Sequence, residues 1–295
     1  MRQLIYQTIN KLGYNIYNKN SNAREIKKKL KKYNIQHHEE LLFLCSKYLF
    51  IFEKNFEDFI VKESEKGLEI SFLDLVFDID SSEEFLILNE IFIDQEYNFV
   101  CNEDCILIDI GANVGIASIY FSQLDHVQKI YSFEPVKDTF EIAENNLKRN
   151  NIMKISQFSN FGLGNLERKE QFLFRNNAKG NCGIRGQLSP SYHGENDYEK
   201  RTVLIKQATE VLEPIFNENK NFKIVVKMDC EGSEYEILEN LYNSYLLNRI
   251  HIIVLEWHDF GAEILENYLK DNNFTVFSRR LSSISGMIYA VRNDY

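Results

Sequence analysis

A group of acidic residues and one histidine follows two apolar stretches in the C-terminal third of the chain. Asp229 and Glu231 come after the first stretch, and Glu256, His258 and Asp259 come after the second. If both stretches are strands of a parallel sheet, their carboxyl ends meet at the sheet edge where open α/β folds bind ligands. Carboxylates and an imidazole gathered there can take a proton from a weakly acidic hydroxyl, so we expect general base catalysis.

His258 is the first candidate for this base, because an imidazole with an unperturbed pKa of about 6.5 is partly neutral at pH 7. The alternative is an exposed loop histidine without a role. Asp229 ends an apolar strand, where an unpaired carboxylate is costly, so we expect it to be paired or to face a ligand. Glu231 is expected to share that role.

The same residue types also suit a divalent ion such as Mg²⁺, with Asp229, Glu256, His258 and Asp259 as ligands. Spacing in one sequence fixes no distances between these atoms, and we predict no metal site.

Two local patterns beside these candidates have a structural interpretation. Ser233 and Glu236 match the S-x-x-E capping box of a helix start. Lys227 lies in mid-strand, where we expect it to pair with Glu231 or Glu256 rather than to act as a catalytic amine.

A glycine turn further upstream predicts a ligand-binding loop. Residues 105–110, CILIDI, run into a turn with Gly111 and Gly115, and a helix follows. The spacing matches neither GxGxxG nor GxxxxGK[ST], and Asp109 would repel a phosphate. Glu134, at the end of the next strand, is placed to accept hydrogen bonds from ribose hydroxyls. The turn therefore favours S-adenosylmethionine over a dinucleotide or a nucleoside triphosphate.

The hydrophobic pattern predicts the elements that position these residues. From residue 105 onward, apolar strands alternate with amphipathic helices, which indicates a parallel sheet covered on both faces. The last two strands, FTVFSRR and MIYAVRN, are joined only by LSSISG and should pair antiparallel. Residues 1–80 are predicted to form a helical and hairpin extension, and residues 81–295 the main domain.

One long irregular segment, residues 176–201, interrupts the alternation of strands and helices. Segments of that length in compact domains are often functional loops, and we expect this one to move over the acceptor site. Its three glycines would supply flexibility and two side chains would contact substrate: Gly180, Gly183, Gly186, Arg185 and Tyr192.

Composition narrows the class of protein. The 295 residues carry a formal net charge of −10, which argues against nucleic acid as the main partner. The five cysteines are scattered without a CxxC pair, which indicates a reduced, cytoplasmic chain. No apolar run reaches the roughly 18 residues of a membrane span, and the start lacks the apolar region of a secretion signal.

Several motifs resemble the FkbM family of S-adenosylmethionine-dependent methyltransferases. They are DIGANVG, FEP, NFGLGN and VKMDCEGSEYEIL, and the similarity covers roughly residues 96–292. The pattern KxDxEGxE, from Lys227 to Glu234, is the most specific part. The resemblance implies an α/β, Rossmann-like methyltransferase sheet of seven strands, mostly parallel, in the order 3-2-1-4-5-7-6 with the last strand antiparallel.

The resemblance also implies roles for individual residues. The methionine end of the cofactor would lie at the glycine turn, the ribose at Glu134 and the adenine edge at Asn160. The cofactor-binding residues implied are Tyr97, Asp109, Gly111, Ala112, Asn113, Gly115, Glu134 and Asn160. The catalytic residues that we predict, from their place at the strand ends rather than from the resemblance, are His258, Asp229 and Glu231.

We therefore predict a cytoplasmic S-adenosylmethionine-dependent O-methyltransferase that acts on a carbohydrate hydroxyl, in a nucleotide sugar, a free sugar or a surface glycan. Trp257 could stack on such a sugar or lie in the core. An alternative acceptor is another small metabolite or a lipid head group. A third possibility is a cofactor-binding module without activity that meets a partner through residues 1–80, although the intact Asp109, Glu134 and Asp229 weigh against it.

Overall fold

The computed structural model describes residues 19–176, 179–184 and 198–294. The chain divides into two compact units, Met1–Ser82 and Glu83–Tyr295. That residues 1–80 and 81–295 are separate domains stays a prediction. Among helices in the described ranges, none is long and apolar enough to cross a membrane.

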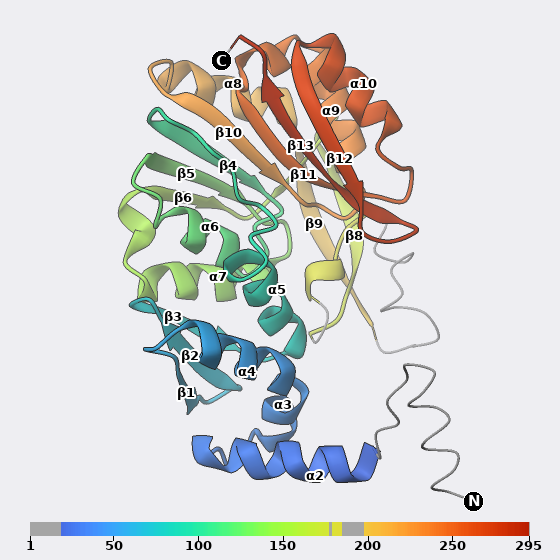
Figure 1. The fold of residues 1–295 in the computed structure, drawn as a ribbon. Helices are drawn as coiled ribbons and strands as arrows, with labels where there is room; N and C mark the ends of the chain where they lie inside the picture. Colours follow the sequence, from blue (N-terminus) through green and yellow to red (C-terminus); the bar gives the residue numbers. More distant parts are fainter. Residues whose placement is uncertain (1–18, 177–178, 185–197, 295) are drawn as a thin grey trace, which may run out of the picture. The chain divides into compact units, whose positions relative to one another are not determined.

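The first unit combines helices with a small antiparallel sheet, in the order β1-β2-β3 (Figure 1). Burial alternates along β2 and β3, so one face of the sheet is apolar. Phe52 packs edge-on against Phe72, with ring centroids 5.1 Å apart. The elements are α2 (Lys19–Leu30), α3 (Glu39–Leu44), α4 (Ser46–Asn55), β1 (Ile60–Glu63), β2 (Leu68–Phe72) and β3 (Leu75–Ile79).

The second unit contains a seven-stranded sheet in the order β12-β13-β11-β10-β4-β5-β6. Its strands are β4 (Cys105–Ile110), β5 (Val127–Phe133), β6 (Ser156–Ser159), β10 (Lys223–Met228), β11 (Ile252–His258), β12 (Phe274–Arg280) and β13 (Ser285–Arg292). Only β13 runs antiparallel to its neighbours, β11 and β12. The predicted strand order and the terminal antiparallel hairpin are confirmed.

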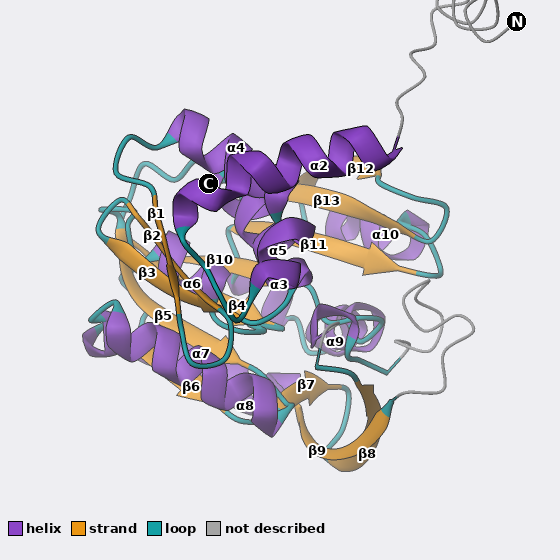
Figure 2. Cartoon of the chain, turned by 90° about the horizontal axis from the view of Figure 1, so that it is seen from below, coloured by secondary structure: helices purple, strands orange, loops and turns teal. Residues whose placement is uncertain are grey.

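Helices and a second sheet complete this unit. Buried residues of α8, α9 and α10 form one core with β4, β10 and β11. A separate three-stranded sheet, in the order β7-β9-β8, was not expected from the sequence (Figure 2). These elements are α5 (Ser82–Phe92), α6 (Ile116–Phe121), α7 (Lys137–Arg149), β7 (Gly162–Gly164), β8 (Arg168–Phe174), β9 (Glu199–Gln207), α8 (Ala208–Glu218), α9 (Glu234–Asn243) and α10 (Glu263–Asp271).

A buried ion pair joins the two central strands just below the edge where ligands bind. Lys227 of β10 is in register with Asp109 of β4, so their side chains meet, with Nζ 3.2 Å from Oδ1. Lys227 Nζ also donates to the carbonyl of Gly111 at 2.7 Å, and Asp109 accepts from the Ser118 hydroxyl at 2.6 Å. The expected pairing of Lys227 with Glu231 or Glu256 is wrong, because the strand register presents Asp109 instead.

The expected capping box at the start of α9 is also absent. Ser233 has helical backbone angles, φ −80° and ψ −13°, and its side chain makes no cap hydrogen bond. A capping residue needs an extended backbone. Glu236 instead pairs with Arg168 at 2.7 Å, a contact made across 68 residues of sequence.

Breaking the Lys227–Asp109 pair should destabilise the fold strongly. Lys227→Met leaves the Asp109 charge buried without its cation, which costs on the order of 3–5 kcal/mol of unfolding free energy. Denaturant unfolding measures this loss, and Lys227→Met combined with Asp109→Asn should lose less. Lys137→Met, which breaks an exposed pair with Glu141, is the matched control and should cost under about 1 kcal/mol. Equal midpoints for Lys227→Met and this control would contradict the expectation.

Candidate active site

The turn after β4 needs glycine at one position. Gly111 has φ +78°, and a Cβ there would lie 1.7 Å from the carbonyl oxygen of Asp229. The turn can therefore pass over β10 only if residue 111 has no side chain. Asn113, with φ +50°, donates its backbone N–H to Glu134 at 3.0 Å. The Asn113 side-chain oxygen is buried and has no hydrogen-bond partner in the described part of the chain.

Glu134 is held at the end of β5 by two backbone amides. One carboxylate oxygen accepts from Asn113 and the other from Val136 at 2.8 Å. Burial raises the pKa of Glu134 to about 7, although both N–H groups and the charge of Lys227 oppose the rise. Each oxygen keeps a lone pair for a ligand hydroxyl.

Two cavities meet at the carboxyl edge of the central strands. The first encloses about 40 Å³ and has Glu134 and an apolar wall of Leu163, Phe172 and Ile205. The second encloses about 200 Å³ and contains Glu256. The residues that line both cavities are Gly111, Asn113, Gly180, Asp229 and Glu231. A group passing from one cavity to the other therefore passes Asp229 and Glu231.

Asp229 and Glu231 occupy this junction, and that they face a ligand stays a prediction. Tyr97 donates its hydroxyl to Asp229 at 2.8 Å. Glu231 has a left-handed backbone, with φ +50°, which is unusual for a residue with a side chain and recurs at functional sites. Burial raises the pKa of Glu231 to about 8; His258 lowers it, and Asp229 and Glu234 raise it further.

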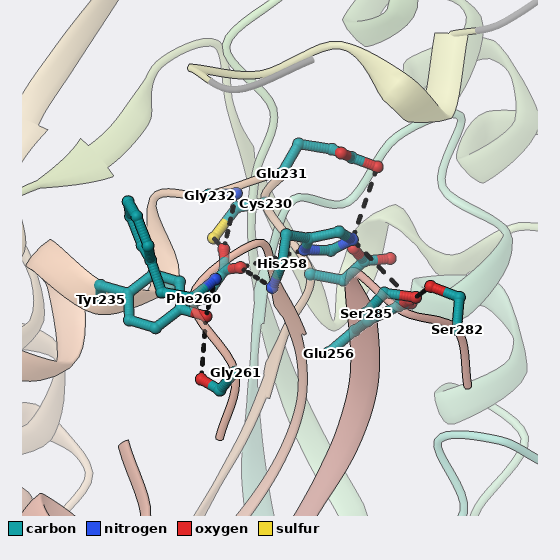
Figure 3. A network of polar contacts seen from close by, with 12 residues as sticks. Cys230, Glu231, Gly232, Tyr235, Glu256, His258, Phe260, Gly261, Ser282 and Ser285 are labelled. Atoms are coloured by element: carbon teal, nitrogen blue, oxygen red, sulfur yellow. Dashed lines mark hydrogen bonds and ion pairs between the residues drawn. The ribbon is translucent and has the colours of Figure 1, made fainter. Parts of the chain in front are cut away.

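His258 is fixed by a carboxylate that the sequence reasoning did not select. Glu234 is fully buried, and one of its oxygens accepts from both the backbone N–H of His258 at 2.7 Å and the ring Nδ1 at 3.0 Å. The other oxygen accepts from the Gly232 N–H at 2.9 Å. In Figure 3 the imidazole lies between Glu231 and Glu256, with Nε2 3.6 Å and 3.7 Å from their oxygens.

These carboxylates keep His258 charged. Burial opposes a charge on the ring, but the hydrogen bond to Glu234 and the charges of Glu231 and Asp229 outweigh it and raise the pKa to about 11. The expectation of a partly neutral imidazole is therefore corrected, because its surroundings are acidic on both sides of the ring. At neutral pH His258 is a proton donor.

A divalent ion is also chemically compatible with this junction. Asp229, Glu231 and His258 each offer a ligand atom within 4.8 Å of the others. Asp259 and Glu256, which the sequence placed in such a set, are not part of this group. The expectation of no metal stays a prediction.

The remaining predicted residues lie at different depths. Ala112 and Tyr97 line the second cavity, whereas Asp109 lies below it as the partner of Lys227. Gly115 packs beneath the turn, where a Cβ would meet Leu147 at 2.5 Å. Asn160 is exposed and donates to the carbonyl of Glu134 at 3.0 Å, outside both sets of lining residues. Their contacts with a cofactor stay predictions.

Trp257 lies in the core, 3% exposed, and lines neither cavity. Of its two possible roles, the structural one therefore holds in this fold.

The start of the irregular segment forms part of the site wall. A buried ion pair joins Lys179 to Glu84 at 2.9 Å, and the Gly180 N–H donates to Glu83 at 3.0 Å. Gly183 packs so closely that a Cβ would lie 2.3 Å from that of Glu231. These two glycines allow close approach to the site. Arg185, Gly186 and Tyr192 lie outside the described residues.

Sequence reasoning missed Glu234 as a partner of His258, and it missed α5 as a wall of the second cavity. Glu234 is visible in the KxDxEGxE pattern, but only the fold shows that its carboxylate reaches the end of β11. The apolar and acidic residues of α5 gave no signal beyond an amphipathic helix.

One family model matches more than half of this chain. The model of the methyltransferase FkbM domain matches residues 109–276. The chain is 27% identical over 203 residues to Methyltransferase 1 of Beauveria bassiana, covering 65% of this chain and 81% of that protein. It is 25% identical over 259 residues to the AMB antimetabolite synthetase AmbE of Pseudomonas aeruginosa, covering 74% of this chain but only 12% of that protein.

A solved methyltransferase FkbM from Methylobacillus flagellatus aligns with 91% of this chain and 59% of its own, with a TM-score of 0.45 and 10% identity.

The charged state of His258 can be measured directly. Nitrogen-15 NMR of the histidine ring should show a pKa far above that of a free imidazole, because Glu234 accepts from Nδ1. Glu234→Gln removes that charge and should lower the His258 pKa by more than one unit, each unit being about 1.4 kcal/mol. Glu239→Gln, an exposed change on the same helix, is the control. A wild-type pKa near 6.5 would refute the assignment.

Proposed function

Because this chain belongs to the methyltransferase FkbM family, whose donor is S-adenosylmethionine, we propose that it transfers the methyl group to a hydroxyl oxygen of a carbohydrate. The observation that carries this proposal is the second cavity, which is lined by carboxylates and shares Asp229 and Glu231 with the first. Carboxylates accept hydrogen bonds from sugar hydroxyls and can remove their protons.

The residues of the first cavity fit the cofactor by their chemistry. Glu134 would accept from the ribose hydroxyls, and the apolar wall of Leu163, Phe172 and Ile205 would cover the adenine. The unpartnered Asn113 oxygen would accept from the methionine ammonium. When bound, the cofactor supplies an electrophilic methyl group on a sulfonium.

Proton removal is assigned to Glu231. A sugar hydroxyl does not ionise near pH 7, and a base works best when its pKa is near the working pH. Glu231 meets this condition and stands at the junction of the cavities. Asp229, held by the Tyr97 hydroxyl, would orient the acceptor, and the charged His258 would favour the ionised form of Glu231.

A second candidate acceptor is another small metabolite. The second cavity also has an aliphatic wall, from Leu86, Ile87 and Ile116. One relative is named as an antimetabolite synthetase, which supports this candidate for the present chain. None of the five cysteines, which all lie in the described ranges, is in a disulfide, and this supports a reducing, cytoplasmic location. Residues 1–80 are proposed as a separate extension of undefined role.

The acceptor class can be tested with labelled S-adenosylmethionine. The protein is incubated with free sugars, nucleotide sugars, small metabolites and lipid head groups, and the products are identified by mass spectrometry. A methyl ether on a sugar is expected. Methylation of nitrogen or carbon, or of an acceptor that is no carbohydrate, would overturn the carbohydrate proposal.

Cofactor affinity should fall in acid. Glu134 has a pKa of about 7 in the free protein, and only its ionised form accepts from both ribose hydroxyls. The carboxyl is protonated below that pKa, so binding of S-adenosylhomocysteine should weaken about tenfold for each pH unit below 7. Calorimetry between pH 5.5 and 8.5 measures this. Glu134→Gln should bind roughly 10- to 150-fold more weakly at high pH and lose the pH dependence. A wild-type affinity that does not change with pH would refute the role of Glu134.

Two variants distinguish Glu231 from His258 as the base. Glu231→Gln should lower kcat by about 10²-fold or more. In the wild type, log kcat should rise with pH up to about 8, where Glu231 loses its proton, and then level off. His258→Gln removes a charge that favours ionised Glu231, so it should shift this profile to higher pH without abolishing turnover. If His258→Gln loses turnover at every pH, then His258 and not Glu231 is the general base.

A further inference from the structure

Helix α5 forms one side of the second cavity with a single face. Its lining residues are spaced at i, i+3, i+4, i+7 and i+8, as expected for one face of a helix. They are Glu83, Leu86, Ile87, Glu90 and Ile91. Along this face of the helix, the aliphatic residues Leu86 and Ile87 therefore lie between the carboxylates of Glu83 and Glu90. The helix precedes residue 109, so it lies outside the part of the chain that the family model matches.

The opposite side of the cavity is acidic as well. Asp229, Glu231 and Glu256 line it from the ends of β10 and β11, together with His258 and Lys227. Both of these cations lie close to a carboxylate that is not part of the cavity lining. Lys227 Nζ lies 3.2 Å from Asp109, and His258 Nδ1 lies 3.0 Å from Glu234. Neither Asp109 nor Glu234 lines the cavity, so the carboxyl groups of the lining outnumber the cations that are available to pair with them.

Glu90 is the clearest sign of this excess. Within the described ranges, neither a hydrogen bond nor an ion pair engages its carboxylate. Its charged neighbours across the cavity are Asp229 and Glu256, which are both acidic. A half-buried carboxyl group that faces other carboxylates is stabilised by a proton or by a positively charged ligand, and burial together with these neighbours raises the pKa of Glu90 to about 8.

We propose that α5 recognises the acceptor, and that this acceptor is a small hydroxyl compound with a protonated amine beside an apolar face. This rests on the proposed function and narrows its substrate class. The ammonium lies between Glu90 and Glu256, and the apolar face lies against Leu86 and Ile87. Phosphate-linked acceptors, which include nucleotide sugars, are rejected because their charges repel the lining.

Three probes on one ring test the charge preference. Dissociation constants of trans-2-aminocyclohexanol, trans-1,2-cyclohexanediol and cyclohexyl phosphate are measured at pH 8 with saturating S-adenosylhomocysteine and a chelator. The amine should bind roughly 10- to 150-fold more tightly than the diol, because this is the gain in affinity expected from one hydrogen bond to a charged group. The phosphate should bind most weakly. Glu90→Gln should remove most of the amine's advantage without changing the affinity for S-adenosylhomocysteine, and Glu239→Gln should keep the advantage.

Each alternative outcome overturns the inference. Equal binding of amine and diol means that the lining is neutralised by protons. Tight diol binding that requires added Mg²⁺ means that a metal supplies the positive charge. An unchanged preference in Glu90→Gln removes α5 from recognition. Failure of S-adenosylhomocysteine itself to bind would instead contradict the proposed function, so the two failures are distinguishable.

Discussion

The contact of Lys227 with Asp109 and with the carbonyl of Gly111 is the constraint on which the active edge depends. It joins the two central strands one residue before β4 ends, and it fixes the turn that separates the cavities. Because both side chains are almost fully buried, neither charge can be solvated if the strands move apart. The positions of Gly111 over β10 and of Asp229 below the turn follow from this contact.

The strand order was predictable only from the resemblance to the FkbM family, whereas the alternation of strands and helices is a local feature of the sequence. The terminal hairpin followed from a six-residue link, and the site edge followed from where the strands end. Contacts that depend on register were not predictable. The partner of Lys227 is set by a pairing 118 residues away along the chain, between positions 109 and 227. The local S-x-x-E pattern failed because Glu236 pairs with Arg168, which only the β7-β9-β8 sheet brings near.

The ionisation of the candidate residues was beyond sequence reasoning for the same reason. Histidine has a pKa near neutrality only when its surroundings are balanced. Here Glu234 meets the ring from α9, while Glu231 and Glu256 face its other nitrogen. As a result the histidine holds its proton, and the pKa of Glu231 is raised to about 8.

Helix α5 lies before the first residue that the family model matches, yet it lines the second cavity. One wall of the second cavity is thus encoded before residue 109, whereas Asp229, Glu231, Glu256 and His258 on the opposite wall lie within the matched residues. The 11 residues of α5 are separate in sequence from both the glycine turn and the KxDxEGxE motif. If α5 selects the acceptor as proposed, exchanging this one helix between relatives would change the acceptor and leave the donor site unchanged.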